Sequence, residues 1–154
     1  MSIPLLPAWR RCVAFPGGKW LFSRLVCFTA PYFGSIRPIV TELDAEHCEV
    51  RIRKSRRVQN HLGTVHAIVM CNMAELAGGL LTDVATPATH RWIPKGMSVE
   101  YLKKAETDLR AVATLDGTPI TGKAAELPVI VKVFDTRDQL VFRARIGMWV
   151  APKK

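Results

Sequence analysis

The feature that most constrains the fold is a long, almost entirely apolar segment with helical periodicity, which directly follows a polar turn. The turn covers residues 60–66, where Gly63 gives conformational freedom and Thr64 is placed to cap a helix. The helix that we expect runs to Leu81, and its buried face consists of Val65, Ile68, Val69, Met73, Leu76, Ala77, Leu80 and Leu81. Its other faces are mostly small or apolar, which is typical of a core helix. The sequence therefore predicts one long helix wrapped by the rest of the protein.

One carboxylate, Glu75, lies in the middle of this apolar helix. Burying an unpaired carboxylate is costly or shifts its pKa, so we interpret Glu75 as a group with a partner or a function. The turn supplies further polar groups, and the start of the helix supplies unpaired N–H groups that can hold an oxyanion. Glu75 lies 8 residues beyond Ala67, which corresponds to about 12 Å along the axis. One chain cannot bring both to one point, whereas two antiparallel copies could, and this favours a dimer.

The bulk properties are those of one globular domain with a preference for anionic partners. The chain has 154 residues, of which 49% are hydrophobic and 23% are charged, and its net charge is +9. A positive excess favours phosphates, nucleic acid or a membrane surface. Because the sequence lacks zinc-finger spacing and RNA-binding motifs, we expect no specific nucleic-acid partner. The four cysteines have neither metal-site nor disulfide spacing, which predicts reduced thiols, no metal and a cytoplasmic protein.

The remaining segments predict an N-terminal helix and an antiparallel sheet. Residues 1–30 are basic and aromatic, with apolar runs too short for a signal peptide or a membrane-spanning helix. They fit a membrane-surface helix or, as we expect, a lead-in packed on the domain, with one helix over 17–30. Alternating polarity predicts strands near 36–43, 48–52, 97–102, 109–115, 129–134 and 140–150. Short connections make the sheet antiparallel and the fold class α+β. We assign residues 1–34 to a helical lead-in and 35–154 to a single domain.

A run of basic residues lies just before the polar turn. The strand over 48–52 continues into Arg51, Arg53, Lys54, Arg56 and Arg57. Such a run is compatible with a solvated strand face. Its position before the turn also suits a rim that binds phosphate groups, and the sequence leaves both interpretations open.

Two groups of residues in this chain resemble the hotdog fold. They are Asn60-x-x-Gly63-Thr64-Val65-His66, followed by Glu75, and then Gly96-Met97-Ser98-Val99-Glu100. Within that superfamily they look most like the acyl-CoA thioesterases of the phenylacetate-pathway type, over about residues 35–150. The resemblance implies a long central helix wrapped by a curved antiparallel sheet, here with an N-terminal helical extension. It also implies homodimers, or dimers of such dimers, whose sheets join around two helices.

The same resemblance assigns roles to individual residues. Asn60 and His66 match the residues of the family's turn, and the N–H of Ala67 would polarise the thioester carbonyl. Glu75 would act as general base or nucleophile, and Ser98 would help to place the water. The positions expected to bind substrate are Gly63, Thr64, Val65, Ile68, Arg53, Arg56 and Arg57. The family has two glycines after its histidine where this chain has Ala67 and Ile68, so Ile68 would narrow the acyl pocket.

The function that the resemblance implies is hydrolysis of a small or medium acyl-CoA, with CoA as part of the substrate and no separate cofactor. A hydratase or dehydratase of the same fold stays open, because His61 and the helix carboxylate Glu75 have a compatible separation. A module that binds acyl-CoA or lipid without turnover stays open as well. Release of a thiol would distinguish the thioesterase from the hydratase, and tight binding without turnover would identify the module.

Overall fold

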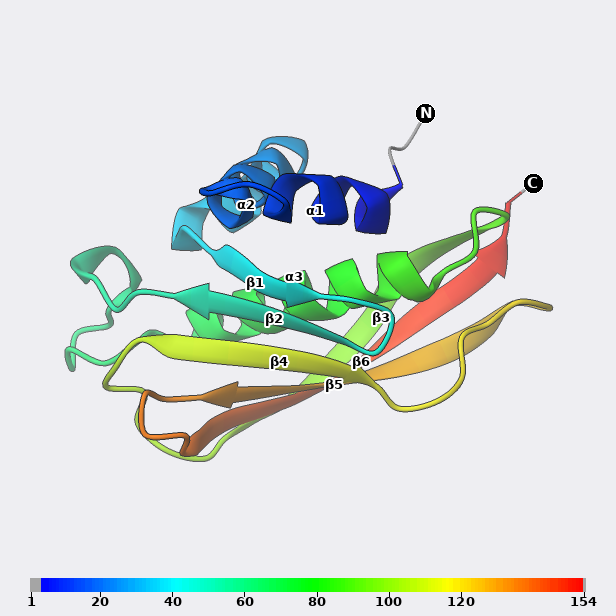
Figure 1. Cartoon of the computed structure of the whole chain (residues 1–154). Coiled ribbons are helices and arrows are strands. Elements are labelled where there is room, and N and C mark those ends of the chain that lie inside the picture. Colours follow the sequence, from blue (N-terminus) through cyan, green and yellow to red (C-terminus); the bar gives the residue numbers. More distant parts are fainter. Residues whose placement is uncertain (1–3, 154) are drawn as a thin grey trace.

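The computed structural model describes residues 4–153, in which one long helix lies against a curved antiparallel sheet (Figure 1). The helix α3 spans Ala67–Ala85. The strands are β1 (Ile39–Leu43), β2 (His47–Ile52), β3 (His90–Tyr101), β4 (Leu109–Leu115), β5 (Ala125–Phe134) and β6 (Leu140–Pro152). Their order in the sheet is β1-β2-β4-β5-β6-β3, so β1 and β3 form its two edges. The predicted α+β hotdog architecture is confirmed.

Helix α3 begins later than the sequence predicted, and the residue expected to cap it does not do so. The cap is His66, whose Nδ1 accepts a hydrogen bond from the Ile68 N–H at 3.1 Å. Val65 is extended, because its N–H donates to the Ala105 carbonyl at 2.8 Å and it forms a β-bridge with Gln59. This bridge keeps Thr64 and Val65 out of the helix. At the other end, α3 continues to Ala85 instead of stopping at Leu81.

Strand β3 is longer than predicted and pairs with β6, which is distant in sequence. The prediction began at Met97, but the strand starts at His90. Pro94 and a shift in register between Pro94 and Gly96 interrupt the alternation that would have marked its first half. A proline is tolerated here because β3 is an edge strand, on which some N–H groups need no partner strand.

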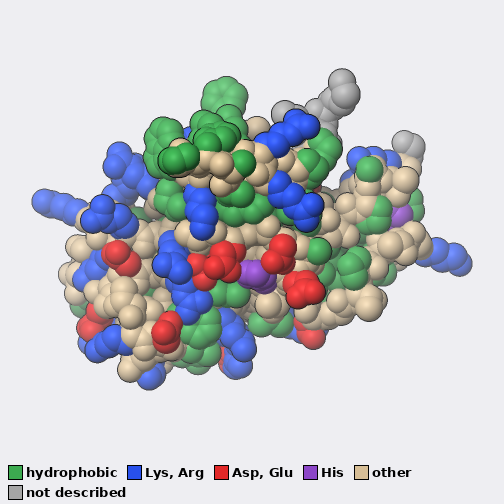
Figure 2. All heavy atoms as spheres, in the orientation of Figure 1, with side chains coloured by type: hydrophobic (Ala, Val, Ile, Leu, Met, Phe, Trp, Pro, Cys, Tyr) green, Lys and Arg blue, Asp and Glu red, His purple; other side chains and the backbone are tan. Residues whose placement is uncertain are grey.

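Two helices precede the sheet where one was predicted, namely α1 (Leu5–Val13) and α2 (Gly18–Thr29), followed by the 3-10 helix η1 (Pro31–Ile36). Trp9 and Phe22 are buried against each other with ring centroids 5.0 Å apart. The buried Ser23 hydroxyl accepts from the Val40 N–H at 2.8 Å, and Arg24 donates to the Pro38 carbonyl at 2.7 Å. Helix α2 therefore covers the β1 edge of the sheet. Figure 2 shows hydrophobic side chains gathered on the outer surface of this helical pair.

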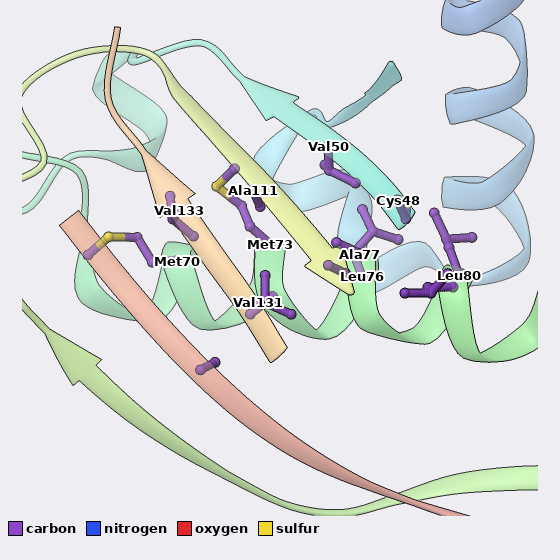
Figure 3. Packing of buried hydrophobic residues seen from close by; sticks show 14 of the residues in the cluster. Cys48, Val50, Met70, Met73, Leu76, Ala77, Leu80, Ala111, Val131 and Val133 are labelled. Atoms are coloured by element: carbon purple, nitrogen blue, oxygen red, sulfur yellow. The ribbon is translucent and has the colours of Figure 1, made fainter. Parts of the chain in front are cut away.

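The core lies between α3 and the concave face of the sheet (Figure 3). Methionine, leucine and alanine side chains of α3 face small and branched residues of β2, β4 and β5, including Met73, Leu76, Val50, Ala111 and Val131. Gly78 allows α3 to approach β6 closely, since a Cβ there would lie 3.1 Å from Cδ1 of Ile146. Within residues 4–153, α3 is the one helix with the length and apolarity of a membrane span, and most of that stretch is buried inside the protein.

Candidate active site

The polar turn before α3 is held closed by Asn60. Its Oδ1 accepts from the N–H groups of Leu62 and Thr64, at 3.0 and 3.2 Å, and its Nδ2 donates to Thr64 Oγ1 at 2.9 Å. Gly63 has a φ of 72°, in the left-handed region that favours glycine. The Asn60 side chain therefore makes its hydrogen bonds within the turn. These bonds fix the direction in which the chain enters α3.

The first turn of α3 is presented at the surface. Ala67 is the first helical residue, so its N–H has no carbonyl one turn earlier to bind. His66 and Ile68 are exposed, and Ile68 shows 55% of its surface. Because His66 Nδ1 accepts from the Ile68 N–H, the proton of the neutral ring is assigned to Nε2. An amide N–H with partial positive charge, bordered by an imidazole and an aliphatic side chain, can polarise a carbonyl oxygen.

Glu75 is exposed within one chain, so the expectation of a buried carboxylate is wrong. The sheet wraps only one side of α3, and Glu75 lies on the open side, 7 residues or two turns beyond Ile68. Cys71 lies between them, with its Sγ 3.2 Å from Tyr101 Oη of β3. The hydrogen bond with Cys71, with burial as a further cause, raises the pKa of Tyr101 to about 12. Ile68, Cys71 and Glu75 thus form an open stripe on α3 beside the β3 edge.

Ser98 is not brought to this stripe by the fold of one chain. It pairs in register with the exposed Arg145 of β6, whereas the adjacent Ala144 and Ile146 are buried under α3. Cross-strand partners share one face of a sheet. Ser98 therefore lies on the face opposite α3.

A basic cleft of about 930 Å³ opens between α2, η1 and the ends of β2 and β4. Three aspartates line it beside seven basic side chains, which are Arg24, Arg37, Arg51, Arg53, Lys54, Arg57 and Arg110. Of the predicted substrate-binding arginines, Arg53 and Arg57 line the cleft and Arg56 is exposed outside it. Arg57 is adjacent to Val58, whose carbonyl accepts from the His66 N–H at 2.8 Å. This contact joins the cleft to the turn.

The sequence missed Arg24, Arg37 and Arg110 as members of this cleft. They come from α2, from the end of η1 and from β4, and no local motif connects these segments. Their proximity follows from the sheet order, which a sequence pattern does not carry. Among residues 4–153, no group of three or more histidine, cysteine or acidic side chains is placed to hold a metal ion.

Two of the cleft arginines are anchored by Glu49, which is buried on β2. Its carboxylate accepts from Thr41 Oγ1 and Arg51 Nε, both at 2.7 Å, and lies 3.3 Å from Arg110 Nη1. Burial raises the pKa of Glu49, but the hydrogen bonds from Thr41 and Arg51 and the charges of Arg51 and Arg110 outweigh it and leave the pKa lowered. The ionised form is therefore the one that the fold favours.

A Glu49→Gln variant should lose stability at neutral pH, by about 1–3 kcal/mol, because the arginines lose a buried charged partner. Since the folded pKa lies below the ordinary value of 4.5, the wild type keeps this contribution above that pH. It then loses it as the pH falls through the lower folded value. Urea unfolding at stepped acidic pH should show a smaller acid loss in the variant. Glu46→Gln, at an exposed turn residue, is the control, and an equal acid loss in the Glu49→Gln and wild-type proteins would contradict the assignment.

Comparison with known proteins gives matches over nearly the whole chain. A crystal structure described as "genomics APC5556" is 42% identical, with a TM-score of 0.84, and the match covers 99% of this chain and 100% of that one. A Pseudomonas aeruginosa protein, PA5026, named "Probable Thioesterase", is 20% identical with a TM-score of 0.77, covering 90% and 97%. The Bacillus halodurans protein BH2602, whose structure contains CoA, is 25% identical with a TM-score of 0.60, covering 66% of each chain.

These structures share the fold of this protein, and several further structures of the same fold carry the name thioesterase. No curated protein matches the sequence. A family model described as "Domain of unknown function (DUF4442)" matches residues 18–150, from the start of α2 to the end of the sheet. Because that match spans most of the chain and the fold is that of the structures above, the protein is a hotdog-fold member of the family described as Domain of unknown function (DUF4442).

Proposed function

We propose that this protein hydrolyses the thioester of a small or medium acyl-CoA. The observation that carries the proposal is that one helix, α3, begins at the half-buried Ala67 and presents the exposed carboxylate of Glu75 on its open side. The Ala67 amide is suited to hold the developing oxyanion, and the carboxylate is suited to activate water or to attack. The recurrence of thioesterases among proteins of this fold supports the same class of reaction.

The two groups are about 12 Å apart along one helix, so the proposal requires a second copy. Strand β3 is a free edge of 12 residues with exposed Ile93, Met97 and Tyr101, and it lies beside the open side of α3. Pairing of two chains through β3 would set two α3 helices side by side and antiparallel. Glu75 of one chain would then approach Ala67 of the other. We propose this homodimer, or a dimer of two such dimers, as the active form.

In the proposed reaction, the thioester oxygen accepts from the Ala67 N–H while an oxygen nucleophile bonds to the carbonyl carbon. With Glu75 as general base, the nucleophile is water, whose proton passes to the carboxylate and then to the departing sulfur as the C–S bond breaks. With Glu75 as nucleophile, a mixed anhydride forms first and water cleaves it. Both routes yield a carboxylic acid and the CoA thiol. The side chain of Ile68, at the helix start, would border the acyl chain and limit its size.

The basic cleft is the proposed site for the phosphate groups of CoA. Arg53 and Arg57 make no ion pair within residues 4–153, which leaves them available to a ligand. The contact of Val58 with His66 places Arg57 next to the turn that precedes Ala67. Arg56 would add charge outside the cleft. A ligand with a polyanionic end and a thioester end suits this arrangement.

Release of free thiol from short, medium, long and aryl acyl-CoAs tests the function. We expect turnover of at least one short or medium substrate, and the aryl member tests the predicted likeness to the phenylacetate-pathway branch. Double-bond hydration without thiol release would favour the hydratase. Tight binding without turnover, measured as a thermal shift with the same acyl-CoAs, would indicate a binding module instead of an enzyme.

A further inference from the structure

Helix α2 carries an apolar face that nothing within residues 4–153 covers. Leu21, Leu25, Phe28 and Tyr32 follow one another at helical spacing from α2 into η1, and Trp20 lies beside them. We name these five residues the α2 apolar face. Phe28 exposes 84% of its surface, Tyr32 69% and Trp20 60%. Figure 2 shows hydrophobic side chains gathered on the outer surface of the helical pair α1 and α2. A contiguous apolar patch of this kind marks a site of interaction.

The α2 apolar face is not needed to hold the helix in place. Phe22 packs edge-on against Trp9, and Ser23 bonds to β1, both from the opposite side of α2. Helix α2 is thus docked on the domain through one side and carries a second apolar side. The lead-in packs on the domain through the side of α2 that carries Phe22 and Ser23. That packing does not explain why the α2 apolar face is also apolar.

The N-terminal segment that carries this face has basic residues and no acidic ones. No aspartate or glutamate precedes Glu42 in the sequence, whereas Arg10, Arg11, Lys19, Arg24 and Arg37 all lie in that stretch. Arg10, Arg11, Lys19 and Arg37 are exposed in the structure. The basic cleft adjoins the face as well, because Trp20 and Arg24 line it. Three aspartates also line that cleft, but they are outnumbered by its seven basic side chains. An apolar surface in a mostly basic surround attracts a partner that is apolar inside and negatively charged outside.

We propose that the α2 apolar face docks this protein on the surface of an anionic phospholipid bilayer. The apolar side chains would enter the acyl region, and the arginines and lysines would bind phosphate headgroups. Trp20 and Tyr32 are aromatic groups with a polar end, which suit the boundary between the acyl region and the headgroups.

Two copies meeting through this face would bring like charges together, which disfavours self-association. Pairing through β3 leaves the face free, since β1 and β3 are opposite edges of the sheet. The proposal does not depend on the proposed enzymatic function.

Vesicle sedimentation of the full chain tests this proposal. Binding is expected to vesicles of phosphatidylcholine mixed with phosphatidylglycerol, and to be weaker to phosphatidylcholine alone. A Leu25→Ser/Phe28→Ser variant should partition at least about tenfold less, because it lacks two of the apolar side chains that would enter the bilayer. Leu62→Ser is the matched control, since Leu62 is 67% exposed but lies in the turn before α3, distant in sequence from α2. Its binding should equal that of the wild type.

Tryptophan fluorescence provides a second measurement that a misfolded variant cannot mimic. Brominated phospholipid should quench the wild-type emission, and a Trp20→Phe variant should bind equally well but lose most of the quenching. The proposal fails if neither vesicle binds, or if the Leu25→Ser/Phe28→Ser variant binds as well as the wild type, which would indicate adsorption by charge alone. It also fails if that variant only changes the mass of a protein oligomer.

Discussion

A Glu75→Gln variant should lower kcat/KM for the preferred acyl-CoA by about a hundredfold to ten-thousandfold. Glutamine keeps the size of the side chain but can neither take a proton from water nor attack a carbonyl carbon. Because Glu75 is exposed within one chain, the free energy of unfolding of that chain should change by no more than about 0.5 kcal/mol. Thiol release and urea unfolding, measured on the same preparation, separate loss of chemistry from loss of fold.

Mixing two inactive variants tests whether Glu75 acts across the dimer. Ala67→Pro removes the proposed oxyanion N–H at the first helical position, where proline is well tolerated. The variant should lose about a hundredfold or more of the activity. Hybrid dimers of the Glu75→Gln and Ala67→Pro chains would contain one complete site, so mixing should restore part of the turnover. Restoration cannot occur if both groups act within one chain.

Asp83→Asn is the matched control for the loss of a carboxylate from the same helix. Asp83 is exposed and accepts from Trp92 Nε1 at 3.1 Å, a bond that an asparagine oxygen can also accept. This variant should hydrolyse acyl-CoA at the wild-type rate. Wild-type turnover by the Glu75→Gln protein would contradict the proposed role of Glu75. It would not contradict the proposed thioesterase activity.

The Phe142→Ala variant should lose about 3–5 kcal/mol of stability. Phe142 is fully buried on β6, with its ring centroid 5.4 Å from that of Tyr101, so truncation removes a large apolar group and leaves a cavity beside the β3 edge. Domains of this size are typically stable by only about 5–15 kcal/mol. Urea or thermal unfolding should therefore show a large shift in the midpoint.

Phe28→Ala deletes the same atoms from a side chain that is 84% exposed. Its stability should lie within about 0.5 kcal/mol of the wild type. The comparison of the two variants distinguishes the effect of burial on stability from the effect of side-chain type. A loss in the Phe28→Ala variant as large as that expected for Phe142→Ala would mean that the α2 apolar face is buried in solution. A small loss in the Phe142→Ala variant would instead contradict the core position of Phe142.

The parts of the fold that could be predicted are those with a clear period. The apolar repeat of α3 and the alternation of β2 and β4 are local patterns, and each led to the correct element. The start of α3 could not be predicted, because Thr64 is a good cap by residue type and only the bond of Val65 to Ala105 makes His66 the cap. The first half of β3 was missed since Pro94 and the adjacent bulge break its period.

The candidate site was predicted unevenly for a related reason. Asn60, Gly63 and His66 form one turn, and residues so close in sequence stay close in space. The exposure of Glu75 depends on how far the sheet wraps α3, which no local pattern encodes. The position of Ser98 came from the resemblance alone. Which face of the sheet it occupies follows from its pairing with Arg145 in β6, and that pairing is not visible in the sequence.

The cover that α2 provides for β1 also sets a limit on how large an assembly can become. With the Val40 amide bound to Ser23, the β1 edge offers little to another strand, and β3 is the long edge left open in the described chain. If two chains paired through β3, the open edge of each chain would be covered by the other. The joined sheet would then have no open edge, so growth by strand pairing would stop at two chains instead of continuing into a ribbon or fibre.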